Sequence, residues 1–219
     1  VGLTLLLPMR GARPPYVLED DARELVVLRD DATAAAWREA LPALVAAGDD
    51  RQALLAAYLG WLDRGEEGLR EAAAAALVDP RSALVPVPPE RALERSRAAL
   101  DPALPAPARR VSAILAGGRV EGARALLAAL RQPDTDPQVA ETAMRGAVQW
   151  RLDERDDALL AGLEHVHAAV RRAAVQLVGM AGSEPGFARL PALAAADPDE
   201  SVRREAEEVL SARGMAGAH

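Results

Sequence analysis

The chain has 219 residues and a formal net charge of −7; half of its residues are hydrophobic and only 3% are aromatic. Most of the apolar residues are Ala, Leu and Val, and Ala and Leu favour helices, whereas strands prefer β-branched and aromatic residues. The acidic balance argues against a general nucleic-acid binder, which carries a basic excess. The absence of cysteine excludes disulfides, thiolate metal ligands and a cysteine nucleophile in this chain.

All 26 basic residues are arginine. We interpret this as the codon usage of a GC-rich, bacterial genome, because arginine used everywhere for surface charge does not by itself make a phosphate-binding site. No transmembrane segment is predicted, because the longest apolar run near the start, Leu3 to Met9, is far shorter than the roughly 20 residues that span a bilayer. The compartment is left open between the bacterial cytoplasm and the cell envelope.

Residues 1–31 form an N-terminal segment that differs from the rest of the chain. Its short apolar runs, Leu3 to Met9 and Leu25 to Leu28, are bounded by Gly and Pro, a pattern that favours strands. Two strands alone are only marginally stable. We therefore expect the remnant of a small β-domain that begins before Val1, and a helix starting at Asp21 is the alternative.

Residues 32–79 are predicted to form helical hairpins. Apolar residues recur at helical spacing from Leu54 to Leu62, and a glycine-containing break separates them from a second helix that opens with Leu69 and Arg70. These two residues stand where a Val-Arg pair stands later in the chain, so we interpret this hairpin as a degenerate repeat.

Residues 80–107 contain seven prolines, a density that forbids a long regular helix. We predict a connector here with a short helix from Glu90 to Leu100, followed by helical repeats over 108–213 and a tail at 214–219. The helices expected after the connector are 109–115, 120–130, 137–150, 157–163, 167–180, 187–195 and 198–213.

A short motif returns three times in this second half. It reads Val139-Ala140-Glu141-Thr142-Ala143, Val170-Arg171-Arg172-Ala173-Ala174 and Val202-Arg203-Arg204-Glu205-Ala206, with its first residues 31 and 32 positions apart. Such periods are typical of stacked helical repeats, which bury a continuous core only together with their neighbours. The sequence thus predicts an all-α fold, an α-solenoid of helical hairpins with a short N-terminal β or irregular segment.

The last unit carries the fullest motif, in which Leu190-Pro191-Ala192-Leu193 leads through Asp197-Pro198-Asp199 to the helix of Val202. It resembles the short bacterial HEAT-like repeat, also called the phycobilisome-lyase repeat. The resemblance covers about residues 119–213 and is weak over 50–79. It implies that Arg171 or Arg203 bonds carbonyls or carboxylates of an adjacent repeat.

Two copies depart from the motif. The copy at 120–150 keeps Asp134 and Asp136 but has Ala140 in place of the arginine, and the middle copy has Glu164-His165-Val166-His167 where the aspartates belong. The two histidines are two residues apart, whereas helical zinc sites use a spacing of four, and no cysteine or further nearby histidine completes a site. We therefore expect no metal, no cofactor and no catalytic residue.

The interpretation we place first is a protein-protein interaction scaffold or adaptor, with a protein rather than a nucleic acid as partner. One alternative is a HEAT-like DNA glycosylase or another nucleic-acid-processing enzyme, for which Trp61 and Trp150 are present; the charge balance opposes it, and Trp150 lies about three turns after Val139, on the buried face. Another is helical support for a missing upstream domain. The residues predicted to bind the partner are Arg145, Arg172, Arg204 and Glu208.

Overall fold

The computed structural model describes residues 51–65, 67–78, 87–132 and 134–216. Every regular element in these ranges is a helix, which confirms the predicted all-α fold for this part of the chain. The segment at 1–31, residues 32–50 and 79 of the predicted hairpins, and residues 80–86 of the connector lie outside the described residues. None of the described helices is long and apolar enough to cross a membrane. The chain divides into two compact units, Val1–Pro86 and Val87–His219, and each is described by itself.

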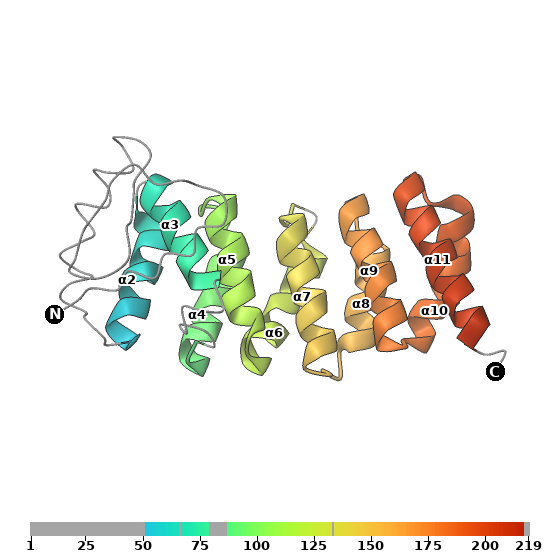
Figure 1. Ribbon diagram of the computed structural model, residues 1–219, viewed down its shortest axis with the longest axis horizontal. Helices are drawn as coiled ribbons and strands as arrows, with labels where there is room; N and C mark the ends of the chain where they lie inside the picture. The colour runs from blue at the N-terminus through green and yellow to red at the C-terminus, as the bar shows by residue number, and fades with distance from the viewer. Residues whose placement is uncertain (1–50, 66, 79–86, 133, 217–219) are drawn as a thin grey trace, which may run out of the picture. The chain divides into compact units, whose positions relative to one another are not determined.

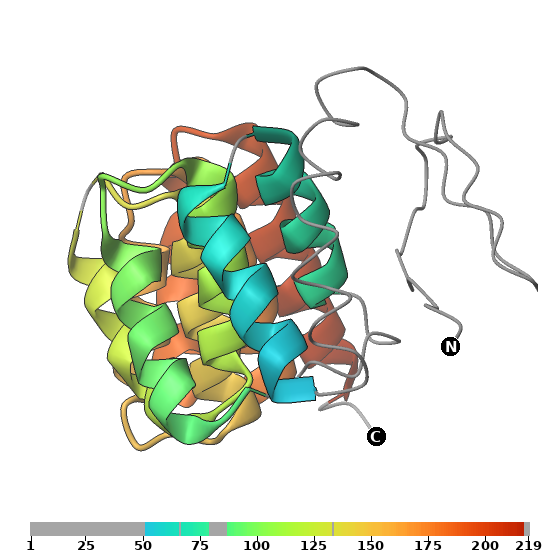
Figure 2. The ribbon, with the colours of Figure 1, turned by 90° about the vertical axis from the view of Figure 1, so that its left-hand side faces the viewer.

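The first unit contains a helical hairpin of α2 (Arg51–Arg64) and α3 (Glu67–Val78), which pack against each other (Figure 2). Leu69, Ala73 and Leu77 of α3 are buried and four residues apart, so they lie on one face of the helix. The same spacing relates the buried residues of the later motif helices, where Val170, Ala174 and Val178 are buried.

The second unit consists of helical hairpins that follow one another along the chain (Figure 1). The first helices pack in succession: α4 against α6, the 3₁₀ helix η2 that continues α6 against α8, and α8 against α10. The second helices α5, α7, α9 and α11 also pack side by side. We call α4, α6, α8 and α10 the first-helix layer and the other four the second-helix layer. Their bounds are α4 Pro89–Leu100, α5 Ala106–Gly117, α6 Val120–Leu126 continued by the 3₁₀ helix η2 Leu127–Arg131, α7 Pro137–Gln149, α8 Arg155–Leu163, α9 Ala168–Ala181, α10 Glu184–Ala196 and α11 Glu200–Ala216.

Local sequence signals explain where several of these helices begin. Pro137 occupies the first turn of α7, and the Asp136 carboxylate before it accepts a hydrogen bond from the backbone N–H of Gln138. The Ser183 hydroxyl caps α10 in the same manner, accepting from the N–H of Gly186. Proline lacks the N–H that would be unsatisfied in a first turn, and a side-chain oxygen satisfies one of the remaining donors.

The ends of α7 and α9 are formed by the same kind of turn with different residues. After α9, Gly182 has φ of 65°, and the N–H of Ser183 donates to the carbonyl of Val178. After α7, Arg151 takes the equivalent left-handed position with φ of 50°, and the N–H of Leu152 donates to the carbonyl of Ala147. Both are Schellman turns, a motif that favours glycine at this position. Arg151 therefore holds a backbone conformation that costs an L-residue free energy.

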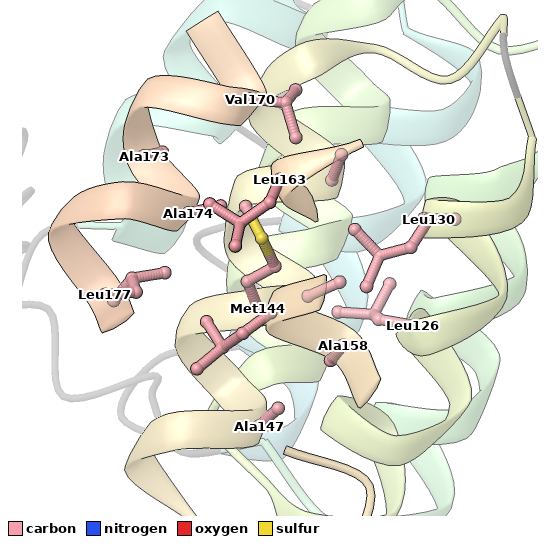
Figure 3. Close-up of a cluster of buried hydrophobic side chains, with 14 of the residues drawn as sticks. Leu126, Leu130, Met144, Ala147, Ala158, Leu163, Val170, Ala173, Ala174 and Leu177 are labelled. Atoms are coloured by element: carbon pink, nitrogen blue, oxygen red, sulfur yellow. The ribbon is translucent and has the colours of Figure 1, made fainter. Parts of the chain in front are cut away.

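The hydrophobic core runs through the second unit between the two layers. Figure 3 shows Met144 of α7 extending toward Leu163 of α8 and Ala174 of α9, and all three residues are buried. Gly162 makes this approach possible, because a Cβ there would overlap Met144 Sδ and lie 3.0 Å from the Cβ of Ala174. The three valines that open the motif, Val139, Val170 and Val202, are fully buried at 0% exposure, which ties each motif helix to this core.

Candidate functional site

The first arginine of the middle motif, Arg171, links two successive repeats. Its Nε and Nη2 donate to Asp197 Oδ2 and Oδ1, both at 2.8 Å, and Asp197 lies in the turn that leads into α11. Its Nη1 donates to the carbonyls of His165 and Val166 in its own turn, at 2.9 and 3.1 Å. The Arg171 and Asp197 side chains are 12% and 2% exposed, so this guanidinium is fully engaged inside the fold. The implied bond between Arg171 and a carboxylate of an adjacent repeat is confirmed.

This ion pair shifts the titration of both partners. The hydrogen bond from Arg171, helped by the attraction between the two charges, lowers the pKa of Asp197 below its ordinary value despite the opposing effect of burial. The bond to Asp197 likewise raises the pKa of Arg171. Both groups are therefore held in their charged forms, as a bidentate arginine–carboxylate pair requires.

The equivalent arginines make the local bond but differ in the bond between repeats. Arg203 Nη1 donates to the carbonyl of Asp197 in its own turn at 2.6 Å, and Arg70 Nη2 donates to the carbonyl of Gly65 at 2.8 Å in the first unit. No described carboxylate pairs with Arg203. The recurring role of this arginine is thus to fix the turn before its own helix, and a second role across the repeat boundary is added at Arg171.

A different arginine provides the link between α5 and α7. Arg110 Nε donates to Asp136 Oδ2 at 2.9 Å, and the Asp136 side chain is 5% exposed. Between α7 and α9, an ion pair of the Arg171–Asp197 kind cannot form, because Ala140 stands at the motif-arginine position of α7 and His165 stands at the position of Asp197. Sequence reasoning missed Arg110, because its link joins other repeat positions: Asp136 lies three residues before its motif valine, whereas Asp197 lies five residues before Val202.

All four residues predicted to bind a partner are exposed and lie on helices of the second-helix layer. Arg145 of α7 pairs with Glu141 at 2.7 Å on the same helix, and Arg204 of α11 approaches Glu208 at 4.0 Å. Arg172 of α9 has no hydrogen-bond or ion-pair partner among the described residues. Their role in binding stays a prediction.

Repeat equivalence places these residues on one surface together with residues that sequence reasoning missed. Ile114, Arg145, Gln176 and Glu208 occupy successive copies of one position, and Arg172, Gln176 and Met180 form a stripe of α9 at a spacing of four. Ile114 and Met180 are apolar but 46% and 74% exposed. We call this surface the second-helix face and define it by Ile114, Arg145, Arg172, Gln176, Met180, Arg204 and Glu208, all of them exposed.

Trp61, Trp150 and His165, which could have indicated other chemistries, make contacts within the fold. Trp150 is half-buried against the core, and its indole Nε1 donates to the carbonyl of Gly117 at the end of α5, at 2.8 Å. Trp61 packs edge-on against Tyr58. His165 Nδ1 accepts a hydrogen bond from the backbone N–H of His167 at 3.2 Å. No group of three or more metal-ligating side chains occurs within the described ranges.

Comparison with known proteins agrees with this geometry for part of the chain. Residues 123–211 match the family model of HEAT repeats. No curated protein and no solved structure matches the chain. The matched segment runs from α6 into α11 and includes all three copies of the motif. Together with the stacked hairpins in two layers, this match identifies residues 123–211 as HEAT-like repeats.

Proposed function

We propose that this chain is a protein-interaction scaffold that binds a partner on the second-helix face and catalyses no reaction of its own. The observation that carries the proposal is the contrast between two adjacent arginines. Arg171 is engaged by four hydrogen bonds inside the fold, whereas Arg172 is exposed and has no partner within the described ranges. Stacked helical repeats present extended surfaces that suit protein binding.

The charges of this face favour a partner with carboxylates. The face carries three arginines and one glutamate, although the whole chain has a net charge of −7. The pairs that Arg145 and Arg204 make with neighbouring glutamates are exposed to solvent, and such pairs are worth at most about 1 kcal/mol. An acidic partner can therefore exchange them for its own carboxylates, while Ile114 and Met180 offer apolar contact. The acidic total charge and the arginine-only composition support a protein partner and a bacterial source.

The test compares two variants with the same change in charge. The face variant replaces Arg145, Arg172, Arg204 and Glu208 by alanine. The matched control replaces three arginines and one glutamate of the first-helix layer, all exposed: Arg97, Arg124, Arg131 and Glu121. A partner is first captured and identified by mass spectrometry, then purified, and its Kd for each variant is measured by calorimetry.

We expect the face variant to bind at least about tenfold more weakly than the wild type, a loss of about 1.4 kcal/mol, with the control unchanged. The association rate of the wild type should fall as salt is raised, because charge complementarity acts mainly on encounter. Equal affinities for the face and control variants would refute the proposal. Affinity for duplex DNA with a steep salt dependence would favour a nucleic-acid function instead.

A further inference from the structure

The turn between α8 and α9 repeats the turn before α11 with a different acceptor. Asp197 lies five residues before Val202, and its Oδ1 accepts from the backbone N–H of Asp199 at 2.9 Å. His165 lies five residues before Val170, and its Nδ1 accepts from the backbone N–H two residues later, at 3.2 Å. In both turns the motif arginine donates to the carbonyl of this acceptor residue. An imidazole nitrogen here replaces a carboxylate oxygen.

This arrangement requires a neutral imidazole in one tautomer. Because Nδ1 accepts a hydrogen bond, the ring proton is on Nε2. Nε2 is buried and has no hydrogen-bond partner in the described part of the chain, and the residue as a whole is 6% exposed. A second proton on Nδ1 would face the N–H of His167, so that two donors would oppose each other and the turn would lose its acceptor.

Among the described residues, no carboxylate acts on the His165 ring. The groups that act on it electrostatically are His167, whose ring lies 5.4 Å away in the same turn, and the guanidinium of Arg171 on α9. The neighbouring carboxylate of Glu164 is directed to Arg189 of α10, at 3.6 Å. On α7, the residue at the motif-arginine position is Ala140, which carries no charge.

We propose that the α8–α9 turn is an acid-sensitive catch, in which protonation of His165 removes the acceptor of the His167 N–H and releases the start of α9. Opening of the turn also withdraws the two carbonyls that hold Arg171 Nη1, so the effect reaches the link between α9 and α11. This regulation is additional to the proposed binding function and does not depend on it.

The sign of the effect follows from linkage. Burial, the neighbouring His167 and Arg171 lower the pKa of His165 below its ordinary value of 6.5. The unfolded or open chain therefore binds the proton more readily than the closed turn. The stability that neutral His165 gives to the closed turn is fully present above about pH 6.5. It is lost as the pH falls from there to the lowered pKa of the closed state.

Hydrogen exchange on the full chain can test the catch against a turn in the same molecule. Protection in a peptide covering residues 164–172 is measured between pH 7.5 and pH 5, corrected for intrinsic exchange, and compared with a peptide covering the Asp197 turn. We expect protection at the α8–α9 turn to fall by up to about tenfold per pH unit between the ordinary pKa of 6.5 and the lowered pKa of His165, and to level off below that, with a smaller loss at the Asp197 turn. Histidine NMR should show that His165 titrates below the ordinary value.

Two variants separate the ring nitrogen from the rest of the turn. His165→Asp supplies the carboxylate found in the Asp197 turn and should keep its protection down to pH 5. His167→Gln retains the backbone donor and should remain acid-sensitive. Acid loss in His165→Asp as large as in the wild type would overturn the proposal. If that variant does not fold, a wild-type His165 that titrates at or above its ordinary value would do the same.

Discussion

Replacing Arg171 by alanine removes the one described side chain that binds its own turn and the next repeat together. The change deletes four hydrogen bonds and leaves Asp197, whose side chain is 2% exposed, without its counter-ion. Removing one partner of a buried ion pair costs about 3–5 kcal/mol. Asp197 retains the hydrogen bond from the N–H of Asp199, so we expect the lower end of that range, about 3 kcal/mol.

Arg203 provides the matched control, because it occupies the same motif position and makes a single described hydrogen bond, to a backbone carbonyl. Its replacement by alanine should cost about 1.5 kcal/mol, the value for one hydrogen bond from a charged donor. Stability is measured by urea unfolding with tryptophan fluorescence, since Trp150 lies within the second unit. Hydrogen exchange across α9 to α11 then shows whether the loss is local, as the quasi-linear architecture of repeats predicts.

Equal costs for the two alanine variants would refute the assignment of the extra stability to the link between repeats. A double-mutant cycle on Arg171 and Asp197 adds an independent check, since residues in contact typically show coupling of about 0.5–3 kcal/mol. Coupling below that range would mean that the pair contributes packing rather than an ion pair.

Arg151→Gly should stabilise the protein by about 0.5–1 kcal/mol, because Arg151 holds φ of 50°. Gly182→Ala should destabilise it by about 1 kcal/mol because of its φ of 65° alone, since the added Cβ would meet no atom within 4 Å. The midpoints of urea unfolding check both predictions. Gly162→Ala should lower the thermal midpoint and cost about 1–3 kcal/mol, since the added methyl overlaps Met144; an unchanged midpoint would contradict the packing described. The stability contributed by Asp197 is present above its ordinary pKa of 3.8 and is lost as the pH falls through its lowered value. The free energy of unfolding of the wild type should therefore fall more over this pH range than that of the Arg171→Ala variant.

The fold of the repeats could be predicted because its signals are local and periodic. The valines 31 and 32 residues apart gave the register of the second helices, and all three are fully buried. Pro137 and Asp136 marked the start of α7 as expected. The prediction that Trp150 lies toward the core agrees with its packing, but its hydrogen bond to Gly117 joins two repeats and has no signal within its own helix.

The pairing of charges between repeats could not be predicted in the same way. Arg171 is the residue after a motif valine, whereas Arg110 is the second residue after Ala108, which occupies the valine position in its copy. A long arginine side chain reaches a carboxylate from either position, so the motif alone does not decide which one pairs. The acceptor role of His165 was also missed, because only its neighbours in space show that an imidazole takes the place of an aspartate.

The unequal boundaries between repeats imply that the joints of this solenoid respond to different conditions. The joint between α7 and α9 depends on apolar contacts around Met144, which weaken on cooling. The joint between α9 and α11 adds the Arg171–Asp197 pair, which is vulnerable to acid instead. Cold should therefore weaken mainly the apolar contacts between α7 and α9, whereas acid should act at the α8–α9 turn through His165 and between α9 and α11 through the Arg171–Asp197 pair.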